Sequence, residues 1–102
     1  MKIFISQPMR NRTEEDILSE RTKIVEYLTK KYGYGEVEII DSPLNLEEGA
    51  TPLEYLGESI KLLAKADRVC FAPNFKLYNG CRVEYQCCIE YLKPIDYYRE
   101  EK

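Results

Sequence analysis

One acidic side chain of this sequence is placed where it could react with a bound ligand. Glu84 closes the segment Tyr78-Asn79-Gly80-Cys81-Arg82-Val83-Glu84, in which Gly80 permits close backbone approach to a ligand at the start of a helix. We expect Glu84 in the first helical turn, where the helix dipole favours an ionised carboxyl. Such a carboxylate can attack an anomeric carbon, or stabilise an oxocarbenium-like transition state. Alternatively, it serves only as a partner of the dipole.

Basic and aromatic side chains form a second group of candidates. Residues 1–12 carry Lys2, Arg10 and Arg12 and no acid. A strand-to-helix turn with arginines and free backbone N–H groups can hold an anion such as phosphate. The turn has no GxGxxG or GxxxxGK[ST] motif, and a solvated pair of arginines is the alternative. Tyr55 and Tyr78 can stack on a planar ligand, or can pack as ordinary core or surface residues.

The absence of histidine narrows the chemistry. Without imidazole, the chain cannot use Ser-His-Asp or Cys-His catalysis or His-ligated metals. The four cysteines, Cys70, Cys81, Cys87 and Cys88, form no CxxC pair. We interpret them as reduced structural residues. No metal and no cofactor is expected.

The elements that would position these residues alternate along the chain. Strands are predicted at 2–6, 36–40 and 68–72 and after Pro94. A helix opens at Thr13, with Asp16 completing a capping box, and Gly33 ends it. Another opens at Thr51-Pro52, with Glu54 in its capping box, and a third covers 81–92. The predicted buried stripe of the second helix is Leu53, Leu56, Ile60, Leu63 and Ala66.

This order predicts one domain over residues 1–102, a flavodoxin/Rossmann-like three-layer α/β/α sandwich. Its sheet would be mostly parallel, with about four or five strands. Ligands bind such folds beyond the carboxyl ends of the strands, which nominates the loops 6–12, 41–51 and 72–80. The second of these is acidic, and is either a lid or an ordinary solvated loop.

Three segments together resemble the nucleoside 2-deoxyribosyltransferase-like superfamily. They are K-I-F-I-S-Q-P-M-R at 2–10, A-D-R-V at 66–69 and N-G-C-R-V-E-Y-Q-C at 79–87. The resemblance spans nearly the whole chain and is closest to a branch of short bacterial and phage proteins in that superfamily. It implies a flavodoxin-like fold, an oligomer, and cleavage or exchange of the N-glycosidic bond of deoxynucleosides or their 5′-monophosphates.

The resemblance also implies roles for individual residues. The nucleophilic glutamate falls on Glu84. The loop that binds phosphate or sugar falls on Ser6, Gln7, Pro8, Met9 and Arg10. The turn that touches sugar or phosphate falls on Asn79 and Gly80. Independently of the resemblance, an aromatic residue such as Tyr78 is expected to stack on the base.

Two positions depart from the family pattern. The catalytic aspartate would fall on Ser59, and the neighbouring Glu58 points about 100° away around the helix. A tyrosine of the first strand falls on Phe4, which has no hydroxyl group.

Two hypotheses follow: an N-glycosidase or deoxyribosyltransferase-like enzyme with Glu84 as nucleophile, or a nucleotide-binding or sensing module that uses the same cleft without turnover. A flavodoxin-type redox module is a more distant third, because the first loop lacks a Ser/Thr/Gly-rich phosphate cradle.

Composition bears on partners and location. The 102 residues are 44% hydrophobic and 32% charged, as in a folded globular protein. A net charge of −3 argues against binding to a nucleic-acid polymer. No apolar run has the length of a membrane span and the N-terminus does not resemble a signal peptide, so a cytoplasmic location is expected. A homodimer or higher homo-oligomer is expected, with Tyr91, Tyr97 and Tyr98 as candidate interface residues.

Overall fold

The computed structural model describes residues 1–40 and 49–99 of the chain. Strands and helices alternate within these ranges. In chain order they are β1 (Lys2–Ser6), α1 (Glu14–Tyr32), β2 (Glu38–Ile40), α2 (Pro52–Ala64), β3 (Arg68–Phe71), a short 3-10 helix η1 (Phe75–Leu77), α3 (Asn79–Glu90) and β4 (Ile95–Tyr97). The predicted order is confirmed, and the loop predicted after β3 contains η1.

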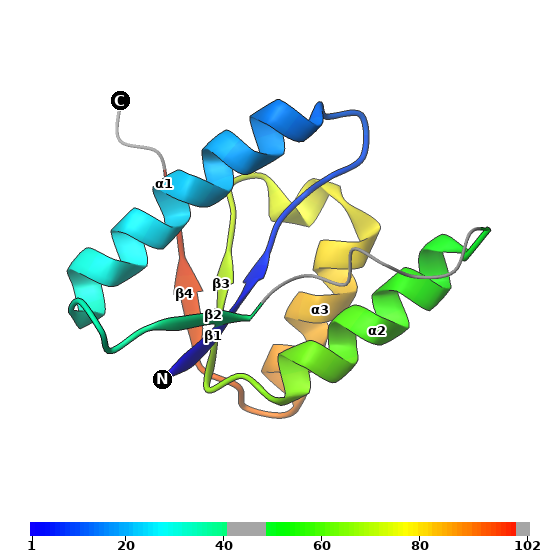
Figure 1. The fold of residues 1–102 in the computed structure, drawn as a ribbon. Coiled ribbons are helices and arrows are strands. Elements are labelled where there is room, and N and C mark those ends of the chain that lie inside the picture. Colours follow the sequence, from blue (N-terminus) through cyan, green and yellow to red (C-terminus); the bar gives the residue numbers. More distant parts are fainter. Residues whose placement is uncertain (41–48, 100–102) are drawn as a thin grey trace.

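The sheet has the strand order β2-β1-β3-β4, and every pairing is parallel. Figure 1 shows α1 on one side of the sheet and α2 and α3 on the other. The predicted flavodoxin/Rossmann-like three-layer sandwich is thus confirmed, with a wholly parallel sheet of four strands. None of the helices in the described ranges is both long and apolar enough to cross a membrane.

Alternation along β1 separates the core into two layers. Ile3 and Ile5 pack with Ile24 and Leu28 of α1 on one face of the sheet. Phe4 faces the opposite layer, among side chains from β3, α2 and α3. Because successive strand residues point to opposite faces, the hydroxyl of Ser6 lies on the same side as Phe4, toward α2 and α3.

The helix starts follow the predicted caps, with two corrections. Thr51 and Glu54 form a complete capping box. Thr13 accepts a hydrogen bond from the backbone N–H of Asp16, but the reciprocal bond expected of a capping box is not formed, because the carboxyl of Asp is one methylene closer to its backbone than that of Glu. Leu53, predicted to be buried, is 74% exposed, since it lies in the first turn of α2 and meets neither core layer.

A charged cluster joins the last strand to α1. The carboxylate of Asp96 in β4 is buried and bonds Lys31 at 2.8 Å, Arg68 at 2.8 Å and the Tyr32 hydroxyl at 2.8 Å. Burial alone would raise the pKa of Asp96, but the hydrogen bonds from Arg68, Lys31 and Tyr32 outweigh it and lower that pKa to about 2. Asp96 therefore remains ionised across the physiological pH range and anchors the end of the sheet.

Candidate functional site

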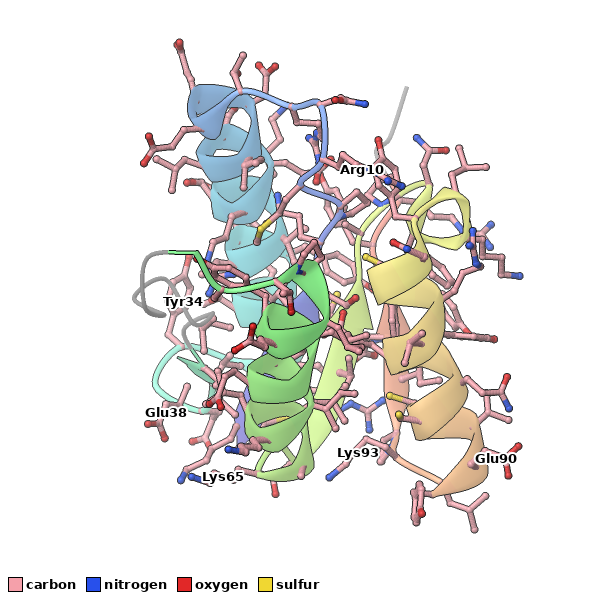
Figure 2. The ribbon with its side chains drawn as sticks, turned by 90° about the vertical axis from the view of Figure 1, so that its right-hand side faces the viewer. Arg10, Tyr34, Glu38, Lys65, Glu90 and Lys93 are labelled. Carbon is pink, nitrogen blue, oxygen red and sulfur yellow. The ribbon has the colours of Figure 1, made fainter. Side chains whose placement is uncertain are left out.

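The chain reverses its winding direction between β1 and β3. The chain leaves β1 toward α1 on one face and leaves β3 toward α3 on the other, although the two strands are neighbours. A crevice opens at the carboxyl ends of strands at such a point. Figure 2 shows Arg10 at this end, near the start of α3, with Lys65 and Lys93 at the opposite end.

A cleft of about 510 Å³ occupies this position. Most of the residues predicted for the site line it, and they come from three separate segments. The lining residues are Gln7, Pro8, Met9 and Arg10 after β1, Pro52, Tyr55, Leu56 and Ser59 of α2, and Tyr78, Asn79, Gly80, Cys81 and Glu84 around the start of α3. Ser6 is absent from this lining, and Pro52, Leu56 and Cys81 were not predicted to belong to it.

Glu84 lies deeper along its helix than predicted. Tyr78 has an extended backbone and caps α3, so the helix begins at Asn79 and its first turn holds no acid. Glu84 falls in the second turn, which corrects the expectation that it sits in the first turn and pairs with the helix dipole. Its side chain is only 6% exposed, at the wall of the cleft.

Burial, opposed by one hydrogen bond, sets the protonation of Glu84. Burial raises the pKa of this carboxyl from 4.5 to about 7, and the Ser6 hydroxyl partly offsets the rise. Ser6 Oγ donates to Glu84 Oε1 at 2.8 Å, and no ion pair involves Glu84 in the described part of the chain. The expectation of a fully ionised carboxylate is thus corrected to a group that titrates near neutral pH.

A thiol completes the immediate surroundings of Glu84. Cys81, one turn before it on α3, is buried, and burial raises its pKa to about 11, while Ser6 opposes this shift. Cys81 is therefore a neutral thiol at neutral pH and not a nucleophile. Burial likewise raises the pKa of Cys88, the next residue along this face, to about 11.

The loop after β1 is fixed by internal bonds, which changes the expected set of anion-binding cations. Arg12 bonds Glu20 at 2.9 Å and the carbonyl of Pro8 at 2.9 Å, and so serves the loop itself. Lys2 lies at the amino end of β1, away from the cleft at the carboxyl end. Of the three predicted cations only Arg10 lines the cleft, and it has no ion-pair partner among the described residues.

Gln7 ties the loop to α1. Its Nε2 donates to the carbonyl of Ile17 at 2.8 Å and to Glu20 Oε1 at 3.0 Å. Its Oε1 is buried and has no hydrogen-bond partner. Gln7 thus helps to set the position of the loop, although it also lines the cleft.

α2 forms the wall of the cleft that faces the loop after β1. Ser59 lines the cleft, whereas Glu58 does not and instead bonds Lys61 at 3.0 Å. The structure therefore places a hydroxyl at the position predicted for the missing aspartate. Tyr55 lies one turn earlier on the same wall. The spacing of Pro52, Tyr55, Leu56 and Ser59 is that of a single helix face, and this spacing could have identified the wall from the sequence.

Most of the predicted lid, residues 41–51, lies outside the described residues. Within residues 1–40 and 49–99, no group of three or more cysteine or acidic side chains is arranged to hold a metal ion. Of the described residues that line the cleft, Glu84 is the one acid.

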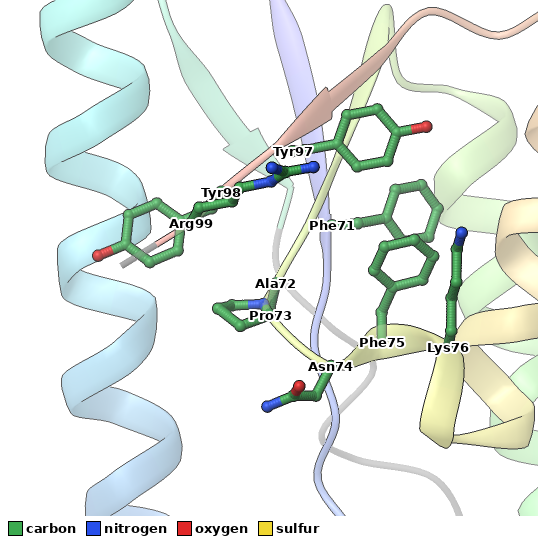
Figure 3. Close-up of a pocket in the computed structure, with 9 residues that line it drawn as sticks. All are labelled: Phe71, Ala72, Pro73, Asn74, Phe75, Lys76, Tyr97, Tyr98 and Arg99. Carbon is green, nitrogen blue, oxygen red and sulfur yellow. The ribbon is translucent and has the colours of Figure 1, made fainter. Parts of the chain in front are cut away.

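A second hollow of about 390 Å³ lies at the carboxyl ends of β3 and β4 (Figure 3). Its wall is aromatic, but the rings pack on one another: the centroids of Phe71 and Phe75 are 4.7 Å apart, and those of Phe75 and Tyr97 are 6.1 Å apart. Lys76 lies over the Phe75 ring at 5.8 Å. The hollow includes part of the nominated loop 72–80, and also Tyr97 and Tyr98, which were predicted as interface residues. It contains none of the individual residues predicted to bind or attack a ligand, and the rings of Phe71, Phe75 and Tyr97 pack on one another.

Comparison with known proteins identifies no relative. No protein-family model matches this chain, and no curated protein and no solved structure is significantly similar to it.

Proposed function

We propose that this protein breaks or exchanges the N-glycosidic bond of a nucleoside or nucleoside 5′-monophosphate, with Glu84 as nucleophile. The observation that carries the proposal is the buried Glu84 carboxyl, which has no ion-pair partner among residues 1–40 and 49–99. It lies at the wall of a cleft to which the described residues contribute one cation and two phenol rings. Strongly perturbed carboxyl groups in clefts are typical of sites that do chemistry. The resemblance in sequence points to the same residue.

The proposed reaction is a double displacement. A Glu84 oxygen attacks C1′ of the sugar and forms a glycosyl ester, while the electron pair of the C1′–N bond leaves with the base. The base takes a proton from water or from a cleft phenol, Tyr55 or Tyr78. Water, or a second base, then attacks C1′ and breaks the ester bond, which releases Glu84 as a carboxylate. The proton that the attacking molecule loses goes to the phenolate or hydroxide left by the first step. The first outcome is hydrolysis and the second is transfer.

The remaining cleft residues have complementary roles in this proposal. Arg10 and the backbone N–H groups at the start of α3 would hold a 5′-phosphate or sugar oxygens. Among those groups, the N–H of Gly80 already has an acceptor, because it donates at 2.9 Å to Asn79 Oδ1. Tyr78 or Tyr55 would stack on the base.

The test measures free base by chromatography. Purified protein is incubated with ribonucleosides, deoxyribonucleosides and their 5′-monophosphates, with and without a second free base to detect transfer. We expect the wild type to release base, and Glu84→Gln to lose this activity by at least about 1000-fold, as when a nucleophile is removed. Glu90→Gln changes an exposed acid of the same helix and should retain activity.

The rate should depend on pH in a defined direction. Attack requires the ionised carboxylate, whose fraction grows as the pH rises through about 7. The rate should therefore increase with pH up to that region and then level off. Base release by Glu84→Gln at the wild-type rate would contradict the proposal.

A second candidate function, binding without turnover, is favoured by one observation. Ser59 occupies the wall where the resemblance expects an aspartate, and Glu84 is the one acid that the described residues bring to the lining. If no substrate of the panel yields free base, the same compounds would be tested by thermal shift. Stabilisation by a nucleotide without turnover would support the binding module.

A further inference from the structure

A buried hydrogen bond between side chains joins β1 to α3. Ser6 is the last residue of β1 and is 1% exposed, yet its hydroxyl faces a carboxyl rather than water. It is paired in register with Phe71 of β3, so its position is fixed by the centre of the sheet. Ser6 is not among the residues that line the cleft, and its hydroxyl is directed at Glu84 instead.

The hydrogen bond distinguishes the two oxygens of Glu84. Oε1 accepts the Ser6 hydroxyl at 2.8 Å, whereas Oε2 receives no hydrogen bond from the described residues. A carboxylate with one oxygen held in this way keeps a fixed orientation and leaves the other oxygen for a ligand. Without that bond, the Glu84 side chain could rotate about its own torsions.

We propose that Ser6 is a positioning residue: it holds Glu84 through Oε1 so that Oε2 is the oxygen that reacts in the cleft. The proposal rests on the proposed function of Glu84. Ser6 is the next residue after Phe4 on the same face of β1. It gives Glu84 a hydroxyl partner, which the Phe4 ring cannot do. The other groups near Glu84 cannot replace Ser6. Cys81 and Cys88 are thiols and therefore weak donors. In the described part of the chain, Arg10, Tyr55 and Tyr78 form no hydrogen bond to the carboxyl.

The test follows the Glu84 carboxyl directly by carbon-13 NMR across a pH titration, in wild type and Ser6→Ala. A hydrogen bond to the charged form lowers a carboxyl pKa, so its loss should raise the pKa of Glu84 by about one pH unit or more. Ser6→Cys, which is nearly isosteric with a weaker donor, should give a smaller rise. The pKa of Asp96, on the other face of the sheet, should stay unchanged in both variants.

Kinetics supply the second readout. Because Ser6 holds the nucleophile and does not line the cleft, Ser6→Ala should lower kcat at least about tenfold with little change in KM, and should move the pH profile to higher pH. An unchanged Glu84 titration in Ser6→Ala would overturn the proposal, as would equal titrations for the Ala and Cys variants. If Ser6→Ala does not fold, the comparison of Ser6→Cys with the wild type decides.

The two proposals can fail separately. The carboxyl titration requires no turnover, so a protein that releases no base still reveals whether Ser6 controls Glu84. Conversely, active protein with an unshifted Glu84 titration would leave the proposed function standing and remove Ser6 from it.

Discussion

Replacing Glu84 by Gln should make the folded protein more stable at neutral and alkaline pH. The side chain is nearly fully buried, and a single hydroxyl is its hydrogen-bond partner among the described residues. Gln has the same shape, carries no charge, and can still accept the Ser6 hydroxyl through its carbonyl oxygen. The substitution therefore isolates the effect of the buried charge from that of packing.

The expected size follows from the pKa. In the folded protein burial raises the pKa of Glu84 to about 7, whereas in the unfolded chain it is about 4.5. Between these two values the folded state binds more protons than the unfolded state, so stability falls as the pH rises. At about 1.4 kcal/mol per pH unit, the full difference amounts to about 3 kcal/mol above pH 7. The amide N–H groups of the replacement lack partners and cost about 1 kcal/mol.

We therefore expect Glu84→Gln to exceed the wild type by about 2 kcal/mol above pH 7. The advantage should disappear, or reverse, below about pH 4.5, where Glu84 is protonated in both states. For a domain of this size, the gain corresponds to a rise in Tm of roughly 10 °C. The gain in free energy is a substantial fraction of the 5–15 kcal/mol by which small domains are stable against unfolding.

The assay is urea unfolding of both proteins at a series of pH values from about 4 to 8. At each pH, the unfolding free energy of the wild type is subtracted from that of the variant, which cancels the contribution of the other titrating groups. The subtraction is valid when the two proteins have the same m-value. Glu90→Gln, on the exposed side of α3, is the matched control and should show a flat difference. A flat difference for Glu84→Gln as well would refute the claim that a buried charge at this position destabilises the fold.

Three further substitutions test the fold and the cleft. Asp96→Asn should lower the free energy of unfolding at neutral pH by about 2–3 kcal/mol. The substitution removes the buried negative charge that pairs with Lys31 and Arg68. Since the pKa of Asp96 is lowered from 3.8 to about 2, that loss should shrink as the pH falls through this interval, measured by denaturation at each pH. Gly80→Ala and Gly57→Ala each place a methyl group where no atom lies within 4 Å apart from adjacent residues and the nearby backbone of the same helix. Each should stabilise its helix by about 0.5–1 kcal/mol. Gly80 alone of the two lines the cleft, so nucleotide binding in a thermal shift assay should weaken in Gly80→Ala and not in Gly57→Ala.

The parts of the fold that could be predicted from the sequence depend on local signals. Thr51 and Glu54 specify a helix start through bonds only three residues apart. The cleft was predictable because the order of elements determines which strand ends meet. Leu53 shows where this reasoning fails: helical periodicity says which face is apolar, but not how far along the helix the sheet covers it.

The surroundings of Glu84 required the structure for two reasons. Its helix begins at Asn79, because Tyr78 takes the capping position, and a shift of two residues moves a carboxyl out of the first turn. Its hydrogen-bond partner is 78 residues away in sequence, a distance at which no local pattern operates. Burial and this one contact set the charge of the group, and neither can be predicted from spacing.

Two buried acids in the same small domain differ in how they are paired, and this difference supports our proposal that Glu84 is the reacting group. Asp96 is held by two cations and a phenol, and its pKa falls to about 2. Glu84 receives one hydroxyl and no cation from the described residues, and its pKa rises to about 7. A carboxyl that only supports a fold gains stability when it is paired, as Asp96 is, because an unpaired buried charge destabilises the folded state. Glu84 lacks such pairing and destabilises the fold when it is ionised, and it lies at the wall of a cleft. A carboxyl that changes protonation near neutral pH can there form a bond to a sugar carbon or take up a proton.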